Sequence, residues 1–398
     1  MTATWYRCCH WLCARIYYER ITVLHPERVP AEGPVLFIGL HRNGAVDGFI
    51  YHQVVPRGVY MVSTQLLRSF FARLFFGGIA VARKKDREDA GQNEKAMRDC
   101  VELLDNGGAL ILFPEGTSTL GPRHLPFKSG AAHIAVDAIA NGILLRIVPL
   151  GIHYERAWAF RSKVEVVVGK SISTEFPEGP GELGKLKEMK RRMSSALEQV
   201  GVNFVSEEDQ KTAECLAYAS TLGTERSYFA SLKALEPGVP DSLRKSWDGL
   251  CQRFSPSFLL RHQNVPLYPG KAWIIYAIAL LILGPLVLAG MVVNFPPLAL
   301  GWIAGWKLAD DRNVIALWRL MVGLPVFLIW LVMVVVLLTV FSNGWWSAGY
   351  VLLTVVSLET IYRTKKVAVS VWNGLFYQSI AKPAWNFHKL LADNLPPE

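Results

Sequence analysis

The chain has 398 residues, of which 51% are hydrophobic and only 19% are charged, and its net charge is +9. The high hydrophobic content excludes a disordered or collagen-like chain. Soluble domains carry about a quarter charged residues, so the low charged fraction indicates a membrane-associated part. The positive charge suits phosphate-bearing partners or anionic lipid, and because no nucleic-acid-binding motif is present, nucleic acid is not an expected partner.

Residues 1–20 have an apolar stripe at helical spacing, formed by Trp5, Cys8, Cys9, Leu12 and Ile16. The pattern predicts an amphipathic helix that lies either on the membrane or on the next domain. The six cysteines of the chain show no paired CxxC spacing, so we expect no metal site and a reducing compartment.

Residues 21–205 alternate short apolar runs with helical patterns. Helices are predicted over 64–76, 90–105 and 129–140. Such alternation predicts an α/β domain with a mostly parallel sheet flanked by helices. The predicted strands are Val35–Gly39, Val59–Val62, Ile79–Ala82, Ala109–Phe113, Ile147–Gly151 and Val164–Val168.

Residues 206–270 are charged and helical and form a predicted linker or subdomain. An α-helical membrane region is predicted over 271–366, with apolar segments at about 273–293, 322–341 and 345–362, followed by a tail over 367–398. Glu359 in the third segment is expected to extend toward the membrane interface, because an intramembrane carboxylate is unfavourable.

Lysine and arginine flank these segments at 261–271, 307–319 and 363–366, whereas the turn at 342–344 has no charge. All basic stretches can be cytoplasmic only if the first segment returns to the side from which it enters. We expect the Gly284–Pro285 pair to break that segment into a re-entrant hairpin. The alternative is that the segment spans and one basic loop lies outside.

His41 lies just after the predicted strand Val35–Gly39, and five residues separate it from Asp47. A neutral imidazole can take a proton from an alcohol when a carboxylate holds its other nitrogen. Positions six apart do not share a helix face, so His41 must precede a helix whose first turns hold Asp47, with Asn43 as the expected N-cap.

Residues 113–118 read FPEGTS directly after another predicted strand, and FKSG follows at 127–130. Gly116 lets the backbone approach a ligand, while Thr117 offers a hydroxyl. Lys128 stands at the start of a helix, where an anion is favoured.

Arg83 ends the predicted strand in the sequence GGIAVAR, and a guanidinium suits a phosphate group. The sequence Val148-Pro149-Leu150 also stands at a predicted strand end, where it is expected to form a pocket wall.

In order and spacing, these four motifs resemble the glycerolipid acyltransferase family, which includes glycerol-3-phosphate and lysophosphatidic acid acyltransferases. The resemblance covers about residues 21–205, and FPEGTS followed by FKSG is its most specific part. The family usually has four residues between the histidine and the aspartate. The five found here are similar to a branch of glycerol-3-phosphate and dihydroxyacetone-phosphate acyltransferases that also carries membrane segments after the catalytic domain.

The resemblance implies an acyltransferase without cofactor or metal, with acyl-CoA or acyl carrier protein as co-substrate. His41 would be the general base and Asp47 its partner. The residues implied to bind the phosphorylated glycerol acceptor are Arg83, Glu115, Gly116, Thr117 and Lys128.

Two other functions stay open at this point. One is acylation of lysophosphatidic acid, also written 1-acylglycerol 3-phosphate, because the motifs do not separate the two acceptors. The other is an inactive lipid-binding membrane scaffold. In each case we expect an integral membrane protein, with the 21–205 domain on the cytoplasmic side.

Overall fold

The computed structural model describes residues 2–82, 90–177, 179, 181–253 and 261–395, which form two compact units. The first unit comprises the chain up to Arg15, then Ile21–His153 and Val164–Asn203. The second comprises Ile16–Arg20, Tyr154–Lys163 and the chain from Phe204 onward. Two short segments that interrupt the first unit in sequence therefore belong to the second.

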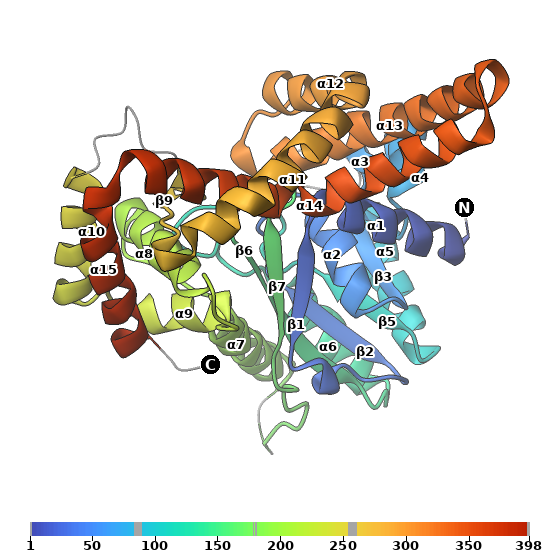
Figure 1. Ribbon diagram of the computed structural model, residues 1–398. Coiled ribbons are helices and arrows are strands. Elements are labelled where there is room, and N and C mark those ends of the chain that lie inside the picture. The colour runs from blue at the N-terminus through green and yellow to red at the C-terminus, as the bar shows by residue number, and fades with distance from the viewer. Residues whose placement is uncertain (1, 83–89, 178, 180, 254–260, 396–398) are drawn as a thin grey trace. The chain divides into compact units, whose positions relative to one another are not determined.

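A seven-stranded sheet forms the centre of the first unit, in the order β1-β7-β6-β2-β5-β3-β4 (Figure 1). The neighbouring pairs from β6 through β2, β5 and β3 to β4 are all parallel. This confirms the predicted mostly parallel sheet and adds strand β1, which the sequence analysis missed. The strands are β1 (Arg20–Leu24), β2 (Val35–Gly39), β3 (Gly58–Ser63), β4 (Ile79–Val81), β5 (Ala109–Leu112), β6 (Arg146–Tyr154) and β7 (Lys163–Val168).

Helices flank this sheet, as predicted. The single helix expected over 64–76 is instead two helices, because Ser69 is extended and its side chain accepts a hydrogen bond from the N–H of Ala72. The helices of this unit are α1 (Ala3–Tyr17, its last two residues in the second unit), α2 (Val46–Val54), α3 (Thr64–Arg68), α4 (Phe70–Phe75), α5 (Ala90–Asp105), α6 (Gly130–Ala140) and α7 (Glu182–Val200).

Helix α1 packs against its own domain. The indole of Trp5 donates to the carbonyl of Leu74, and the hydroxyl of Tyr6 donates to the carbonyls of Arg73 and Phe76. The structure shows contacts of this helix with the domain, and Trp11 leaves 56% of its surface exposed, so contact with the membrane stays a prediction.

The second unit is helical. Its long apolar helices are α11 (Trp273–Val293), α12 (Phe295–Lys307), α13 (Ile315–Phe341) and α14 (Gly344–Phe376). The break expected at Gly284–Pro285 is wrong, because α11 continues through Pro285. The chain turns instead at Asn294, where two prolines occupy the start of α12 and suit a first helical turn. The remaining helices are α8 (Glu207–Ser220), α9 (Tyr228–Leu235), α10 (Asp241–Arg253) and α15 (Ala381–Asn394).

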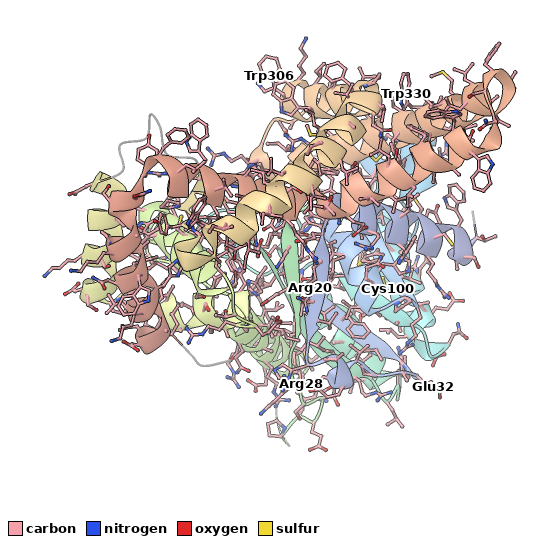
Figure 2. All side chains as sticks on the ribbon, in the orientation of Figure 1. Arg20, Arg28, Glu32, Cys100, Trp306 and Trp330 are labelled. Carbon is pink, nitrogen blue, oxygen red and sulfur yellow. The ribbon has the colours of Figure 1, made fainter. Side chains whose placement is uncertain are left out.

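Two of these stretches, Trp273–Val293 and Arg312–Phe341, are long and apolar enough to cross a membrane. The third predicted segment lies in α14 and is helical, but no such stretch is found there in the described part of the chain. Large apolar side chains cover these helices, among them Leu281, Ile329 and the Trp306 that Figure 2 labels, which are 76%, 70% and 68% exposed. Apolar surface of this extent marks a membrane or protein interface.

Helices α11 and α12 form a hairpin whose turn contacts the middle of α13 and α14. The Asn294 amide donates to Thr354 Oγ1 at 3.1 Å, and the Tyr350 hydroxyl donates to Asn294 Oδ1 at 2.8 Å. Gly301 of α12 approaches Gly323 of α13 so closely that an added Cβ would lie 3.3 Å from the facing Cα. The connection between α13 and α14 lies farther along the chain, at 342–343.

Candidate active site

The site forms where two neighbouring strands end. Strands β2 and β5 are adjacent and parallel, with Ile38 opposite Leu112. His41 follows the end of β2 by two residues, and Glu115 follows the end of β5 by three. Because the carboxyl ends of parallel strands meet at one edge of a sheet, these two residues become neighbours although 74 positions separate them.

His41 and Asp47 form the central pair. His41 Nδ1 lies 2.9 Å from Asp47 Oδ2, and Asp47 is fully buried in the first turn of α2. The same oxygen accepts the backbone N–H groups of Arg42 at 2.6 Å and Asn43 at 2.8 Å. These contacts hold the Asp47 carboxylate in place against Nδ1 of His41, which leaves Nε2 as the ring nitrogen that can accept a proton.

The expected N-cap is wrong. Helix α2 begins after Ala45, and no side chain caps it. Asn43 lies earlier in the turn, where its backbone N–H bonds the Asp47 carboxylate. Gly44 follows with φ of +54°, a left-handed conformation that carries the chain from His41 into the helix.

The Glu115 carboxylate joins two loops. Oε1 accepts the backbone N–H of His41 at 2.9 Å, and Oε2 accepts the N–H of Leu125 at 3.0 Å. The residue is only 2% exposed, and burial raises its pKa, against the opposing effect of these two N–H groups and of the Arg42 charge. Both oxygens therefore face backbone donors, an arrangement that fixes the position of His41.

Phe113 is a site residue whose role the sequence analysis missed. Its ring stacks on the His41 imidazole, with centroids 4.3 Å apart and planes inclined by 8°. Tyr51 lies beneath, fully buried, and its hydroxyl donates to the carbonyls of Leu40 and Leu150. The signal was present, since an aromatic residue opens the FPEGTS motif at the strand end beside the histidine.

The remaining motif residues form a rim beside this pair. Gly116 has φ of +71°, and the Lys128 ammonium lies so close that an added Cβ would collide with it. The Lys128 N–H donates to the Pro114 carbonyl at 2.9 Å, which closes the loop. Thr117 and Lys128 are exposed.

The predictions for Arg83 and for Val148-Pro149-Leu150 are not confirmed by the structure. Arg83 lies outside the described residues, so its phosphate-binding role stays a prediction. Val148-Pro149-Leu150 is not at a strand end, because β6 continues to Tyr154, and Pro149 pairs with Ile38 inside the sheet. The four residues His41, Asp47, Glu115 and Gly116 are brought together.

This arrangement can accept a proton at His41 Nε2 and stabilise the resulting imidazolium through Asp47. Nothing in it requires a metal, and the described residues contain no group of three or more His, Cys, Asp or Glu side chains that could hold one.

Residues 20–153 match the family model described as Acyltransferase. A 1-acyl-sn-glycerol-3-phosphate acyltransferase of Chlamydomonas reinhardtii is 26% identical over 35% of this chain and 42% of its own length. Glycerol-3-phosphate O-acyltransferase 2 of Saccharomyces cerevisiae is 33% identical over 20% of this chain and 11% of its own. A 1-acyl-sn-glycerol-3-phosphate acyltransferase of Haemophilus influenzae is 33% identical over 26% of this chain and 43% of its own length.

The chain thus spans less than half the length of each of these curated relatives. Among solved structures, the 1-acyl-sn-glycerophosphate acyltransferase PlsC from Thermotoga maritima aligns with a TM-score of 0.38 and 17% identity. That alignment covers 50% of this chain and 78% of the other.

Proposed function

We propose that this chain is a membrane-bound O-acyltransferase of phospholipid synthesis, because residues 20–153 match the Acyltransferase family model and its relatives include a 1-acyl-sn-glycerol-3-phosphate acyltransferase and a glycerol-3-phosphate O-acyltransferase. It moves a fatty acyl group from acyl-CoA or acyl carrier protein to the hydroxyl of a phosphorylated glycerol. The observation that carries this proposal is the His41–Asp47 pair at the strand ends, with Nδ1 held at 2.9 Å from the carboxylate.

The chemistry follows from that pair. His41 Nε2 takes the proton of the acceptor hydroxyl while the hydroxyl oxygen attacks the thioester carbonyl. Asp47 stabilises the imidazolium that forms, and the imidazolium then returns the proton to the departing thiolate. The products are an ester and a free thiol. Positioned base catalysis of this kind contributes about 10²–10⁴-fold to the rate.

We propose glycerol 3-phosphate or dihydroxyacetone phosphate as the acceptor, on the basis of the five residues between His41 and Asp47. Arg83, Glu115, Gly116, Thr117 and Lys128 are the proposed acceptor site, and Lys128 supplies its cation beside Gly116. The names of several relatives favour 1-acylglycerol 3-phosphate as a second candidate acceptor.

We also propose that the acyltransferase domain lies on the cytoplasmic side of the membrane. The exposed apolar surface of α11 to α14 supports membrane insertion. Lysine and arginine occur near the start of α13 and in the second half of α14, whereas the connecting turn at 342–343 is uncharged.

The test is an acyl-transfer assay on membranes that contain the chain. Labelled palmitoyl-CoA or palmitoyl carrier protein is supplied with glycerol 3-phosphate, dihydroxyacetone phosphate or lysophosphatidic acid in parallel. We expect a monoacyl product that is lost in His41→Ala and kept in His133→Ala, which changes an exposed histidine on α6.

Phosphatidic acid formed only from added lysophosphatidic acid would establish the second candidate acceptor instead. Absence of turnover with every donor and acceptor, in membranes that contain folded protein, would contradict the enzyme and leave the inactive lipid-binding scaffold.

A further inference from the structure

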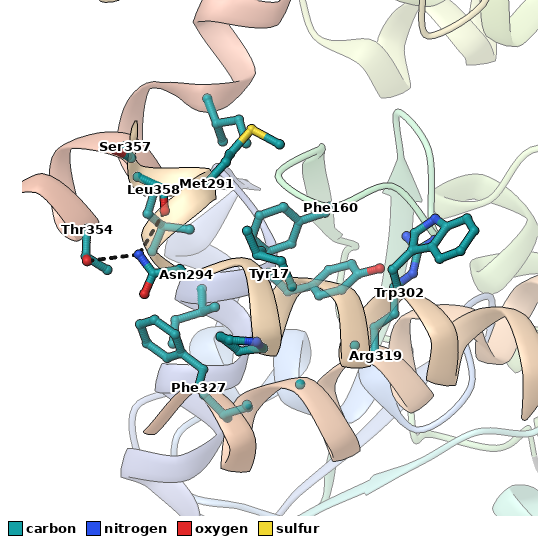
Figure 3. Close-up of a pocket in the computed structure, with 18 of the residues that line it drawn as sticks. Tyr17, Phe160, Met291, Asn294, Trp302, Arg319, Phe327, Thr354, Ser357 and Leu358 are labelled. Atoms are coloured by element: carbon teal, nitrogen blue, oxygen red, sulfur yellow. Dashed lines mark hydrogen bonds between the residues drawn. The ribbon is translucent and has the colours of Figure 1, made fainter. Parts of the chain in front are cut away.

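The helical unit contains a cavity of about 320 Å³ between α11, α12, α13 and α14 (Figure 3). Tyr17 and Phe160, from the two short inserted segments, complete its lining. Most of the lining is apolar, and several of its side chains are also exposed on the outer surface, including Met291, Leu298 and Trp302 at 43%, 37% and 58%. The cavity is therefore accessible from the apolar surface of these helices.

Arg319 supplies a positive charge to the lining. Its Nη1 donates to the Trp158 carbonyl at 2.9 Å, and the Tyr17 hydroxyl donates to the same carbonyl at 2.8 Å. Arg319 Nε is buried and has no hydrogen-bond partner within the described part of the chain. Burial raises the pKa of Tyr17 to about 12, so this hydroxyl remains a donor at neutral pH.

Two further guanidinium groups gather at Trp158. Arg156 lies 5.3 Å and Arg312 lies 5.5 Å from the centre of its ring. Two carboxylates lie near these groups. The Asp311 carboxylate accepts the backbone N–H of Arg312, and the Glu214 carboxylate interacts electrostatically with the Arg156 guanidinium. Arg319, which lines the cavity, therefore contacts a residue that two further guanidinium groups also contact, and this concentration of positive charge favours an anionic oxygen ligand.

The amide of Asn294, elsewhere in the lining, needs no ligand. Its Nδ2 donates to Gly290 and Thr354, and its Oδ1 accepts the Tyr350 hydroxyl. Met291, Leu324 and Phe327 make the rest of this part of the cavity apolar. The cavity thus combines an apolar interior with a cationic residue, which is the complement of an anionic amphiphile.

We propose that this cavity is a lipid-binding site that takes an acyl chain among α11 to α14 and holds an anionic phosphate head group against Arg319. Ligand pockets commonly measure about 300–1,000 Å³, and 320 Å³ is at the lower end, which suits one chain rather than two. Neither His41 nor Asp47 lines this cavity, and the proposal does not depend on the proposed acyl transfer.

The test uses the purified full-length chain in nanodiscs of phosphatidylcholine, without acyl donor. A lysophosphatidic acid analogue with a photoactivatable diazirine on its chain is bound, irradiated and mapped by peptide mass spectrometry. We expect label on peptides within residues 291–327, in wild type and in His41→Ala alike. Label confined to peptides of the acyltransferase domain would overturn the proposal.

Competition identifies the ligand chemistry. Unlabelled lysophosphatidic acid should displace the probe, and glycerol 3-phosphate and uncharged monoacylglycerol should not. Displacement by phosphatidic acid as well would support a bilayer lipid as the source, whereas displacement by lysophosphatidic acid alone would support a single-chain lipid. Equal displacement by monoacylglycerol would overturn the role assigned to Arg319.

Two pairs of variants complete the test. Leu298→Trp fills the cavity and should abolish labelling, whereas Leu288→Trp, 63% exposed on α11 and outside the lining, should not. Arg319→Gln should weaken probe binding by about tenfold or more, as expected for loss of a charge-assisted hydrogen bond. Lys307→Gln removes an exposed cation near the end of α12 and should leave binding unchanged.

Discussion

Each unit gives an example of a different way to hold a buried polar side chain. In the first, Asp47 and Glu115 accept hydrogen bonds from the backbone N–H groups of nearby loops. In the second, charged and polar side chains bond one another across long stretches of sequence. Arg161 pairs with Glu359 at 3.2 Å across 198 positions, and the Tyr362 hydroxyl donates to Glu155 across 207.

The difference has a physical meaning for each unit. A carboxylate held by backbone donors keeps its place as long as the strands and loops keep theirs, so the active-site geometry follows from the fold of a local segment. A pair of side chains can join two elements that lie far apart in the sequence. In the helical unit such pairs therefore fix which segments pack together.

Asp47→Asn should separate catalysis from folding most clearly. The amide oxygen can still accept the N–H groups of Arg42 and Asn43, but the charge that stabilises the His41 imidazolium is lost. We expect the turnover number to fall by about 10²–10⁴-fold, while the melting temperature in detergent changes little. A fall in melting temperature that accounts for the lost activity would contradict this view.

Glu359→Gln should have the largest effect on stability. It leaves the Arg161 guanidinium, whose side chain is 0% exposed, without its counter-charge. Removing one partner of a buried pair costs about 3–5 kcal/mol, and we expect the lower end because Glu359 itself is 40% exposed. Chemical denaturation in detergent measures the loss.

The matched control is Glu207→Gln, which breaks a pair whose side chains are 72% and 65% exposed and should cost under about 1 kcal/mol. Arg161→Met combined with Glu359→Gln should recover part of the loss, because no unpaired charge then remains. Equal losses for Glu359→Gln and Glu207→Gln would show that the buried pair does not join the segments.

Glu115→Gln should reduce stability by about 1–3 kcal/mol, because an amide cannot accept both backbone N–H groups and one is left unpaired. Burial raises the pKa of Glu115 above its ordinary value of 4.5, so the folded chain keeps this proton to a higher pH than the unfolded chain does. The glutamate therefore stabilises the fold most at acidic pH, and this contribution is lost as the pH rises through the folded-state pKa.

The loss caused by Glu115→Gln should accordingly be larger near pH 4 than near pH 7, as followed by thermal unfolding across that range. Glu102→Gln, at an exposed position on α5, should show no such dependence. A loss that grows with pH would mean that the carboxylate is the form that the fold prefers.

Gly116→Ala should have the smallest effect, about 1–2 kcal/mol, because its φ of +71° is unfavourable for a residue with a Cβ. Lys128 must also move to make room for the methyl group. Gly130→Ala, where an added Cβ meets no atom within 4 Å, should be neutral or slightly stabilising. Melting temperatures of the two variants provide the comparison, and equal values would contradict the strain assigned to Gly116.

The same contrast explains how far the sequence could be interpreted. His41 and Asp47 are six residues apart, so their spacing and the strand before them were enough to predict their approach. Glu115 was expected only as an acceptor-binding residue, and its hydrogen bond to the His41 N–H depends on which strands are neighbours in the sheet, which the sequence did not predict. The N-cap assigned to Asn43 was wrong because a glycine turn replaced a side-chain cap, and that choice depends on backbone angles.

The helical unit was harder to predict. Apolar length indicated the helices, but a proline inside a packed helix is tolerated when neighbouring groups satisfy the backbone, so Gly284–Pro285 did not mark the turn. Glu359 was expected to extend toward the membrane interface. Its partner is Arg161, and no local pattern connects two residues 198 positions apart.

The short segment Tyr154–Lys163, which lies between β6 and β7 but belongs to the helical unit, has a consequence for biosynthesis. Ribosomes add roughly 5–20 residues per second, so Arg161 is made about 10–40 s before Glu359, 198 residues later. During this interval the strands on either side of the segment are complete, while the helix that neutralises its buried arginine does not yet exist. The Arg161 charge therefore stays in water until translation has passed Glu359.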